Sequence, residues 1–229
     1  MEFEIPKDLS YYERPLISLI LPCNSYARYG NYYLGAVWKR AVKSIIKSGI
    51  NPKNVMLTAV DCIIVAEDPS SDKNTKGAIV FGTLEDMKRV KGYNVYPSWK
   101  RFKKNNYKFL YEMVEGIKIG LNRLLKEANP DLIVSVLNVL GYKLAFYKAV
   151  EELDLWDKVL FIDIPPTPAY IWKGIKLAVE YIKEFLSGSK NSGIVMTQES
   201  MGWYSARKST IPEGFEISES DRVTIIEGY

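Results

Sequence analysis

Histidine is absent from this chain of 229 residues. Its absence excludes a Ser-His-Asp triad, a Cys-His dyad and a histidine-ligated zinc site. Acid–base catalysis must therefore fall to Asp, Glu, Tyr, Lys or Cys side chains. We expect neither a metal centre nor a cofactor.

Cysteine is almost as scarce, because the chain contains only Cys23 and Cys62. Two thiols form no disulfide scaffold and no structural zinc site, which favours a reduced, intracellular setting. The N-terminal MEFEIPKDLS has no apolar region typical of a signal peptide. The longest apolar runs are far shorter than the roughly 20 residues of a membrane span. We therefore expect a cytoplasmic protein without a membrane partner.

The glycine-rich signatures of common nucleotide-binding folds, G-x-G-x-x-G and Walker A, are also missing. What is present is ordinary globular composition, with 47% hydrophobic and 25% charged residues. This length can bury a substantial core. We predict a single α/β domain over 1–229, with its core over 15–197 and a C-terminal extension over 198–229.

Strand-like and helix-like patterns alternate along the chain. Short apolar runs typical of buried strands cover 16–21, 55–59, 131–137 and 158–163, with further candidates at 62–66, 78–81, 194–197 and 223–226. Helical periodicity covers 34–47, 107–125, 141–153 and 167–186. This alternation predicts a three-layer α/β/α sandwich with a mainly parallel sheet of four to five strands.

Polar residues stand where four of the predicted strands end. They are Cys23, Asn24 and Ser25 after the first strand, then Asp61, Asn138 and Asp163. Because the carboxyl ends of parallel strands meet at one edge of a sheet, we expect a shared cleft there. Asp61, Asp163 and Cys23 are the candidate catalytic residues, and the others are candidates for substrate binding. The structural alternatives are a buried thiol, Asx turns and an ion pair of Asp163.

Aromatic and basic residues gather in two places. Tyr29 and Tyr33 belong to a tyrosine cluster whose rings suit a flat heterocycle. Within 88–108, lysines and arginines alternate with aromatics, an arrangement suited to phosphates and stacked bases. Its candidate nucleic-acid contacts are Lys100, Arg101, Lys103 and Lys104. The alternative is a solvated surface, since the net charge is only +4. The segment 203–208 (WYSARK) repeats the pattern, either as a phosphate or base contact or as a cap on the core.

The segment 21–29 (LPCNSYARY) resembles a motif in the domain shared by archaeosine synthase and archaeal tRNA-guanine transglycosylase relatives. The segment 94–97 (NVYP) resembles that family's Tyr-Pro element, and the helix and strand after it keep the family's order. The chain retains Pro22, Cys23 and Tyr29 of the signature but has Gly35 in place of its histidine, as in a diverged member. The resemblance implies a uracil-DNA-glycosylase-like fold and chemistry on a tRNA base, with Tyr96 among the substrate-binding residues.

Three functions stay open at this point. The first is a nucleobase-directed tRNA modification protein or subunit, of transferase or glycosylase type if it is an enzyme. Its partners would be tRNA or single-stranded nucleic acid and, because 229 residues leave no room for further RNA-binding domains, a second protein chain. The second is a non-catalytic nucleic-acid-binding homologue. The third is a small-molecule enzyme of nucleotide or sugar metabolism.

Overall fold

The computed structural model describes residues 6, 8–21, 32–60, 79–81, 107–137, 140–165, 167–217 and 222–227, and the structural statements below concern these residues. The strands are β1 (Ile17–Ile20), β2 (Val55–Ala59), β3 (Ile79–Val80), β4 (Leu132–Leu137), β5 (Val159–Asp163), β6 (Gly193–Thr197) and β7 (Val223–Ile226). The helices are α1 (Tyr32–Lys47), α6 (Tyr107–Glu127), α7 (Leu140–Glu152), α8 (Pro168–Leu186) and α9 (Gln198–Ser205). Short 3₁₀ turns cover Leu9–Tyr11, Pro52–Asn54, Trp156–Lys158 and Lys208–Thr210.

All seven strands pair in one parallel sheet, in the order β3-β2-β1-β4-β5-β6-β7. The strand order reverses between β1 and β4, where Ile17 pairs with both Val55 and Leu132. The central strands are buried on both faces, which explains their continuous apolar sequences. The predicted α/β class is confirmed. The sheet has more strands than the four or five predicted, because the short β3 and the late β6 and β7 all join it.

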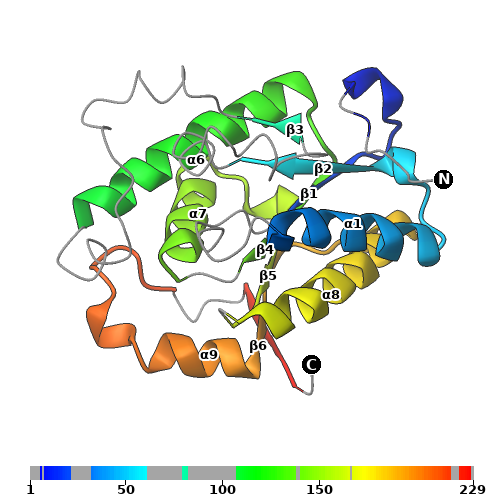
Figure 1. The fold of residues 1–229 in the computed structure, drawn as a ribbon. Helices are drawn as coiled ribbons and strands as arrows, with labels where there is room; N and C mark the ends of the chain where they lie inside the picture. The colour runs from blue at the N-terminus through cyan, green and yellow to red at the C-terminus, as the bar shows by residue number, and fades with distance from the viewer. Residues whose placement is uncertain are drawn as a thin grey trace.

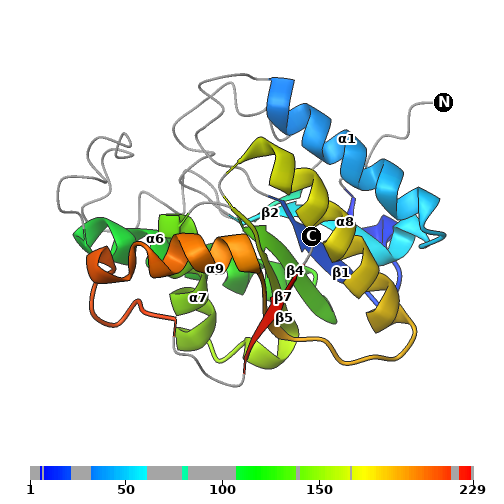
Figure 2. The same ribbon diagram turned by 90° about the horizontal axis from the view of Figure 1, so that it is seen from below.

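Helices cover both faces of the sheet and make three layers (Figures 1 and 2). On one face, α1 and α8 pack on alternate residues of the strands, including Leu19 and Val134. On the other face, α6, α7 and α9 cover the intervening residues, including Ile20 and Ile133. This alternation follows from the two-residue period of strand side chains. It creates two apolar cores, one on each side of the sheet.

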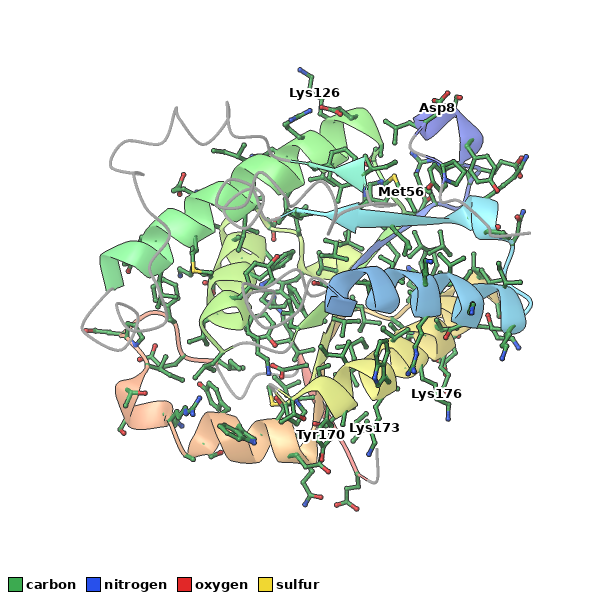
Figure 3. All side chains as sticks on the ribbon, in the orientation of Figure 1. Asp8, Met56, Lys126, Tyr170, Lys173 and Lys176 are labelled. Carbon is green, nitrogen blue, oxygen red and sulfur yellow. The ribbon has the colours of Figure 1, made fainter. Side chains whose placement is uncertain are left out.

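The long helices are amphipathic, as the sequence pattern predicts. In α8, Ile171, Ile175 and Ile182 are buried against the sheet. Figure 3 shows Lys173 and Lys176 pointing away from the molecule on the opposite side of the same helix. The burial of one helical face against the sheet provides most of the stability of such a helix. None of the helices in the described part of the chain has the length and apolar character of a membrane span.

Helices α7 and α9, which follow β4 and β6, differ from this amphipathic pattern. Helix α7 is buried without interruption from Gly141 to Tyr147. Helix α9 starts directly after β6, where the side chain of Thr197 accepts a hydrogen bond from the Ser200 backbone N–H and caps the helix. The sequence pattern did not predict α9, because Ser200 and Tyr204 are its only buried residues. These two helix starts surround the end of β5.

Candidate functional site

Asp163 is the last residue of β5 and lies at the carboxyl edge of the sheet, between Leu137 of β4 and Met196 of β6. Only 1% of its surface is exposed. A carboxylate that is removed from water is stable only when it is paired and hydrogen-bonded. The neighbours of Asp163 therefore define the site.

Three donors from two helices surround the Asp163 carboxylate. Lys143 Nζ and Ser200 Oγ both donate to Oδ1, and the Tyr147 hydroxyl donates to Oδ2. Lys143 and Tyr147 are four residues apart on α7, so they lie on one face of that helix. Ser200 comes from the first turn of α9. The site thus joins the carboxyl ends of β4, β5 and β6, whereas the cleft predicted from the sequence lies at the ends of β1, β2, β4 and β5.

Lys143 has all of its hydrogen-bonding capacity in use. Besides Asp163, its Nζ donates to the Ile164 carbonyl oxygen and to Ser200 Oγ, both at 2.8 Å. An ammonium group has three protons, so these three acceptors match the charged form. We refer to Lys143, Tyr147, Asp163 and Ser200 as the Asp163 cluster.

Burial changes the proton affinities within the Asp163 cluster. Desolvation lowers the pKa of Lys143, and the Asp163 carboxylate opposes this effect. Desolvation, followed by the charge of Asp163, raises the pKa of the Tyr147 hydroxyl well above 10. Tyr147 therefore stays a neutral donor at physiological pH, while Lys143 gives up its proton more readily than a lysine in water.

A small hollow of about 20 Å³ opens onto the cluster. Its lining consists of Leu140, Lys143, Asp163, Ser200, Trp203, Tyr204 and Arg207. A water molecule needs roughly 10–15 Å³, so the hollow accepts one water or one small group of a larger ligand. A complete nucleobase does not fit inside the described hollow.

The rim of the hollow presents an aromatic and a cationic group from the C-terminal part of α9 and the residues after it. Trp203 is 43% exposed. The Arg207 guanidinium lies 4.7 Å from the centre of the Trp203 ring, in a cation–π arrangement. Tyr204 points the other way: it is buried, and its hydroxyl accepts from the Ile217 backbone N–H at 2.7 Å. Tyr204 thus acts as a cap on the core, whereas a phosphate or base contact of the 203–208 segment stays a prediction.

A larger cavity of about 60 Å³ has Tyr147, Trp156 and Phe215 among its walls. Its charged groups already have local partners. Lys148 pairs with Glu151 at 2.7 Å, and Glu216 accepts from the Gly214 backbone N–H at 2.7 Å. The Asp163 cluster is the stronger candidate for chemistry, because its ion pair is buried and the pKa of Lys143 is lowered by that burial.

Of the residues predicted for the site, Asp163 is the one whose side chain the structure describes. Tyr33 lies in α1, and its side chain is outside the description. The remaining candidates also lie outside the described residues: Cys23, Asn24, Ser25, Tyr29, Asp61, Tyr96, Lys100, Arg101, Lys103, Lys104 and Asn138. The described strands β1 and β4, which precede Cys23 and Asn138 in the chain, are neighbours in the sheet.

The sequence reasoning missed Lys143, Tyr147 and Ser200. A signal for the first two was present, since the segment 141–150 (GYKLAFYKAV) is apolar on nearly every side. Such a helix is buried, and a lysine within it needs a partner. Ser200 gave no comparable signal, because it stands in a polar stretch. Among the described residues, no group of three or more His, Cys, Asp and Glu side chains is placed to hold a metal ion.

The fold and the site define the chain as an α/β protein with a parallel sheet and a buried Lys–Asp–Ser cluster at the carboxyl edge of that sheet. Comparisons with protein-family models, with curated proteins and with solved structures find no match to it.

Proposed function

We propose that this chain is a nucleobase-directed protein that acts on nucleic acid, with tRNA as the first candidate, at the carboxyl edge of its sheet. The observation that carries the proposal is the arrangement of Asp163 beneath Trp203 and Arg207. Ligands of parallel α/β proteins bind outside the carboxyl ends of the strands. An exposed tryptophan offers a base a stacking surface, and the guanidinium offers a phosphate two parallel donors.

The size of the hollow determines how such a ligand would bind. The base would stack on Trp203 at the rim, and a single exocyclic group would enter the hollow above Asp163 and Ser200. Arg207 would hold the backbone phosphate beside the base. The resemblance to the archaeosine synthase family supports tRNA as the source of that base. The choice of tRNA stays a prediction.

A binding experiment with paired variants tests this proposal. A labelled tRNA transcript and a labelled single-stranded RNA are titrated against wild type, Trp203→Ala and Arg207→Ala at several salt concentrations. Loss of one stacked base weakens binding by about 1–3 kcal/mol, or roughly 5- to 150-fold. Loss of one phosphate contact lowers the slope of log K against log salt by about 0.7 for a single strand.

Lys126→Ala is the matched charge control, because Lys126 lies near the end of α6, far from α9 (Figure 3). We expect it to bind both RNAs nearly as wild type does. If Trp203→Ala and Arg207→Ala also bind as tightly as wild type, the rim is not a nucleic-acid site and the proposal is wrong.

A second candidate, a non-catalytic nucleic-acid-binding protein, is favoured by one observation. Each proton of Lys143 already has an acceptor within the protein, as in a purely structural ion pair. Salt-dependent RNA binding by a protein that leaves the RNA chemically unchanged, measured by mass spectrometry of the digested RNA, would identify this function.

A further inference from the structure

Ser200 occupies an unusual position for a serine in a polar C-terminal segment. It is 2% exposed, and its hydroxyl lies between the amine of Lys143 and the carboxylate of Asp163. The Lys143–Asp163 pair is already compensated by its own contact and by the Ile164 carbonyl and Tyr147 hydroxyl. Ser200 adds the third acceptor of the Lys143 ammonium and a second donor to Asp163 Oδ1.

One lone pair of the Ser200 hydroxyl oxygen is not used by the hydrogen bonds of the Asp163 cluster. Its oxygen accepts one proton from Lys143 and donates its own proton to Asp163, which leaves one lone pair without a partner among these bonds. Ser200 also lines the hollow that admits one small group. Its backbone is held by the N–H bond to Thr197 at 3.2 Å. A fixed oxygen that lines a hollow and has a lone pair outside these bonds is placed to meet a group that enters the hollow.

We propose that Ser200 is a catalytic nucleophile, with Lys143 as its general base and Asp163 as the residue that positions Lys143. The Nζ–Oγ distance of 2.8 Å lies within the range for direct proton transfer. The sequence contains no histidine, and the two side-chain groups that contact Ser200 Oγ, an amine and a carboxylate, are placed to take its proton. A base that is itself oriented by a third group is the arrangement that activates serine in unrelated folds. The lowered pKa of Lys143 is consistent with this role.

The reaction that fits is acyl transfer from an ester or amide. The cycle begins once Lys143 has lost one proton to water, so that its lone pair accepts the hydroxyl proton that Ser200 gives to Asp163 in the resting cluster. Ser200 Oγ then bonds to the acyl carbon while the carbonyl π electrons move to oxygen and the serine proton moves to Lys143. The intermediate collapses, the bond to the leaving oxygen or nitrogen breaks, and that atom takes the proton from Lys143. Water then attacks the acyl-serine while Lys143 takes a proton from it. The bond between the acyl carbon and Ser200 Oγ breaks, Oγ receives that proton from Lys143, and the acid leaves. The cycle consumes one water and needs no oxidant or reductant.

The substrate class follows from the rim and depends on the proposed function. The acyl group would be carried by a nucleobase-bearing ligand that stacks on Trp203 and places a phosphate on Arg207. The nucleophile itself does not depend on that assignment, so the two proposals are tested separately.

A serine-reactive fluorophosphonate probe tests the nucleophile directly, because Oγ displaces fluoride from phosphorus while the serine proton is taken up by the base. We expect intact-mass analysis of folded wild type to show one adduct and peptide mapping to place it on Ser200. Ser200→Ala should not react. Ser205→Ala should react like wild type, since Ser205 is an exposed serine on the same helix.

Lys143→Arg tests the base. Arginine keeps the positive charge beside Asp163 but does not lose its proton in proteins, so we expect the labelling rate to fall by about 10²- to 10⁴-fold. Circular dichroism and a thermal melt establish that the variant is folded. An unchanged labelling rate in folded Lys143→Arg would overturn the role of Lys143. The absence of a Ser200 adduct in wild type would overturn the nucleophile whether or not the variant folds.

RNA binding separates this result from the proposed function. The wild-type protein used for labelling is therefore also titrated with the tRNA transcript, so that labelling and binding are measured on the same protein. Labelling of Ser200 without RNA binding would support the role of Ser200 as a nucleophile and overturn the nucleic-acid proposal. RNA binding without labelling would support the nucleic-acid proposal and overturn the role of Ser200.

Discussion

Lys143 and Asp163 form an ion pair that is almost completely removed from water. Replacing one member leaves the other charge buried without compensation, which destabilises a protein by about 3–5 kcal/mol. We therefore expect Lys143→Met and Asp163→Asn each to lower the free energy of unfolding by an amount in this range. The double variant should lose much less than the sum of the two, because it leaves no unpaired charge. Urea unfolding of the four proteins measures this difference.

Trp203→Ala is the control for the ion-pair cycle, since Trp203 lines the same hollow but is exposed. We expect it to change the free energy of unfolding by much less than either single variant. Strict additivity of Lys143→Met and Asp163→Asn would show that the two side chains are not coupled in the folded protein.

Tyr147 makes the free energy of unfolding depend on pH in the alkaline range. Its pKa is raised well above 10 in the folded state, whereas an unfolded tyrosine ionises near 10. Above that pH the folded state binds more protons than the unfolded state, so the free energy of unfolding falls as pH rises. Below it Tyr147 is neutral in both states and contributes no slope. We expect wild type to lose stability above pH 10 more steeply than Tyr147→Phe.

Tyr111→Phe is the matched control for the alkaline series, because Tyr111 of α6 is half exposed, whereas Tyr147 is buried. Denaturant midpoints between pH 8 and 11 provide the comparison. Parallel curves for wild type and Tyr147→Phe would show that the Tyr147 hydroxyl is not the neutral donor that the Asp163 carboxylate requires.

At the scale of elements, the close packing of α6 on the sheet depends on a missing side chain. A Cβ at Gly120 would lie 2.4 Å from the Val60 carbonyl oxygen and 2.7 Å from that of Phe81. Both are backbone atoms just after β2 and β3, so neither can move without shifting its strand. We expect Gly120→Ala to lower the free energy of unfolding by at least about 1–3 kcal/mol, as overpacking does.

Gly202 provides the control within α9, because a Cβ there would meet nothing within 4 Å. Alanine is the better helix former, so we expect Gly202→Ala to leave stability unchanged or raise it by up to about 1 kcal/mol. Thermal melts of both variants test the contrast. Equal effects of the two substitutions would contradict the close approach of α6 to the ends of β2 and β3.

Most elements could be predicted from the sequence at this scale. The strand from Val55 to Ala59 and the helix from Pro168 to Leu186 begin and end as their patterns indicate, because apolar periodicity records which side faces a core. Helix α9 could not be found in this way. It depends on the Thr197 cap and on the burial of Ser200 and Tyr204, which leave little periodicity in the sequence.

For the whole molecule, the strand order predicts a gradient of local stability. Strands β4 and β5 are paired on both sides and fully buried. The edge strand β7 pairs with β6 among the described strands, and its Ile225 is 48% exposed. Opening of β7 exposes little new apolar surface, so it should occur far more often than opening of the centre.

Hydrogen exchange followed by mass spectrometry measures that gradient. We expect peptides covering 223–226 to exchange orders of magnitude faster than peptides covering 132–137 and 159–163. Peptides of β1, which is also paired on both sides, should resemble the centre. Equal protection of β7 and β4 would mean that a further contact, such as a second chain, covers the open edge of β7.

The sequence by itself determined the α/β class, the positions of most strands and helices, and Asp163 as a polar residue at a strand end. These features are local, since a run of ten or twenty residues carries its own pattern of burial. Tertiary structure alone decided which side chains meet. Lys143 is 20 positions from Asp163 and Ser200 is 37 positions from it, and their contact depends on β4, β5 and β6 lying side by side. Because that order results from packing helices on both faces of the sheet, no local pattern encodes the Lys–Asp–Ser cluster.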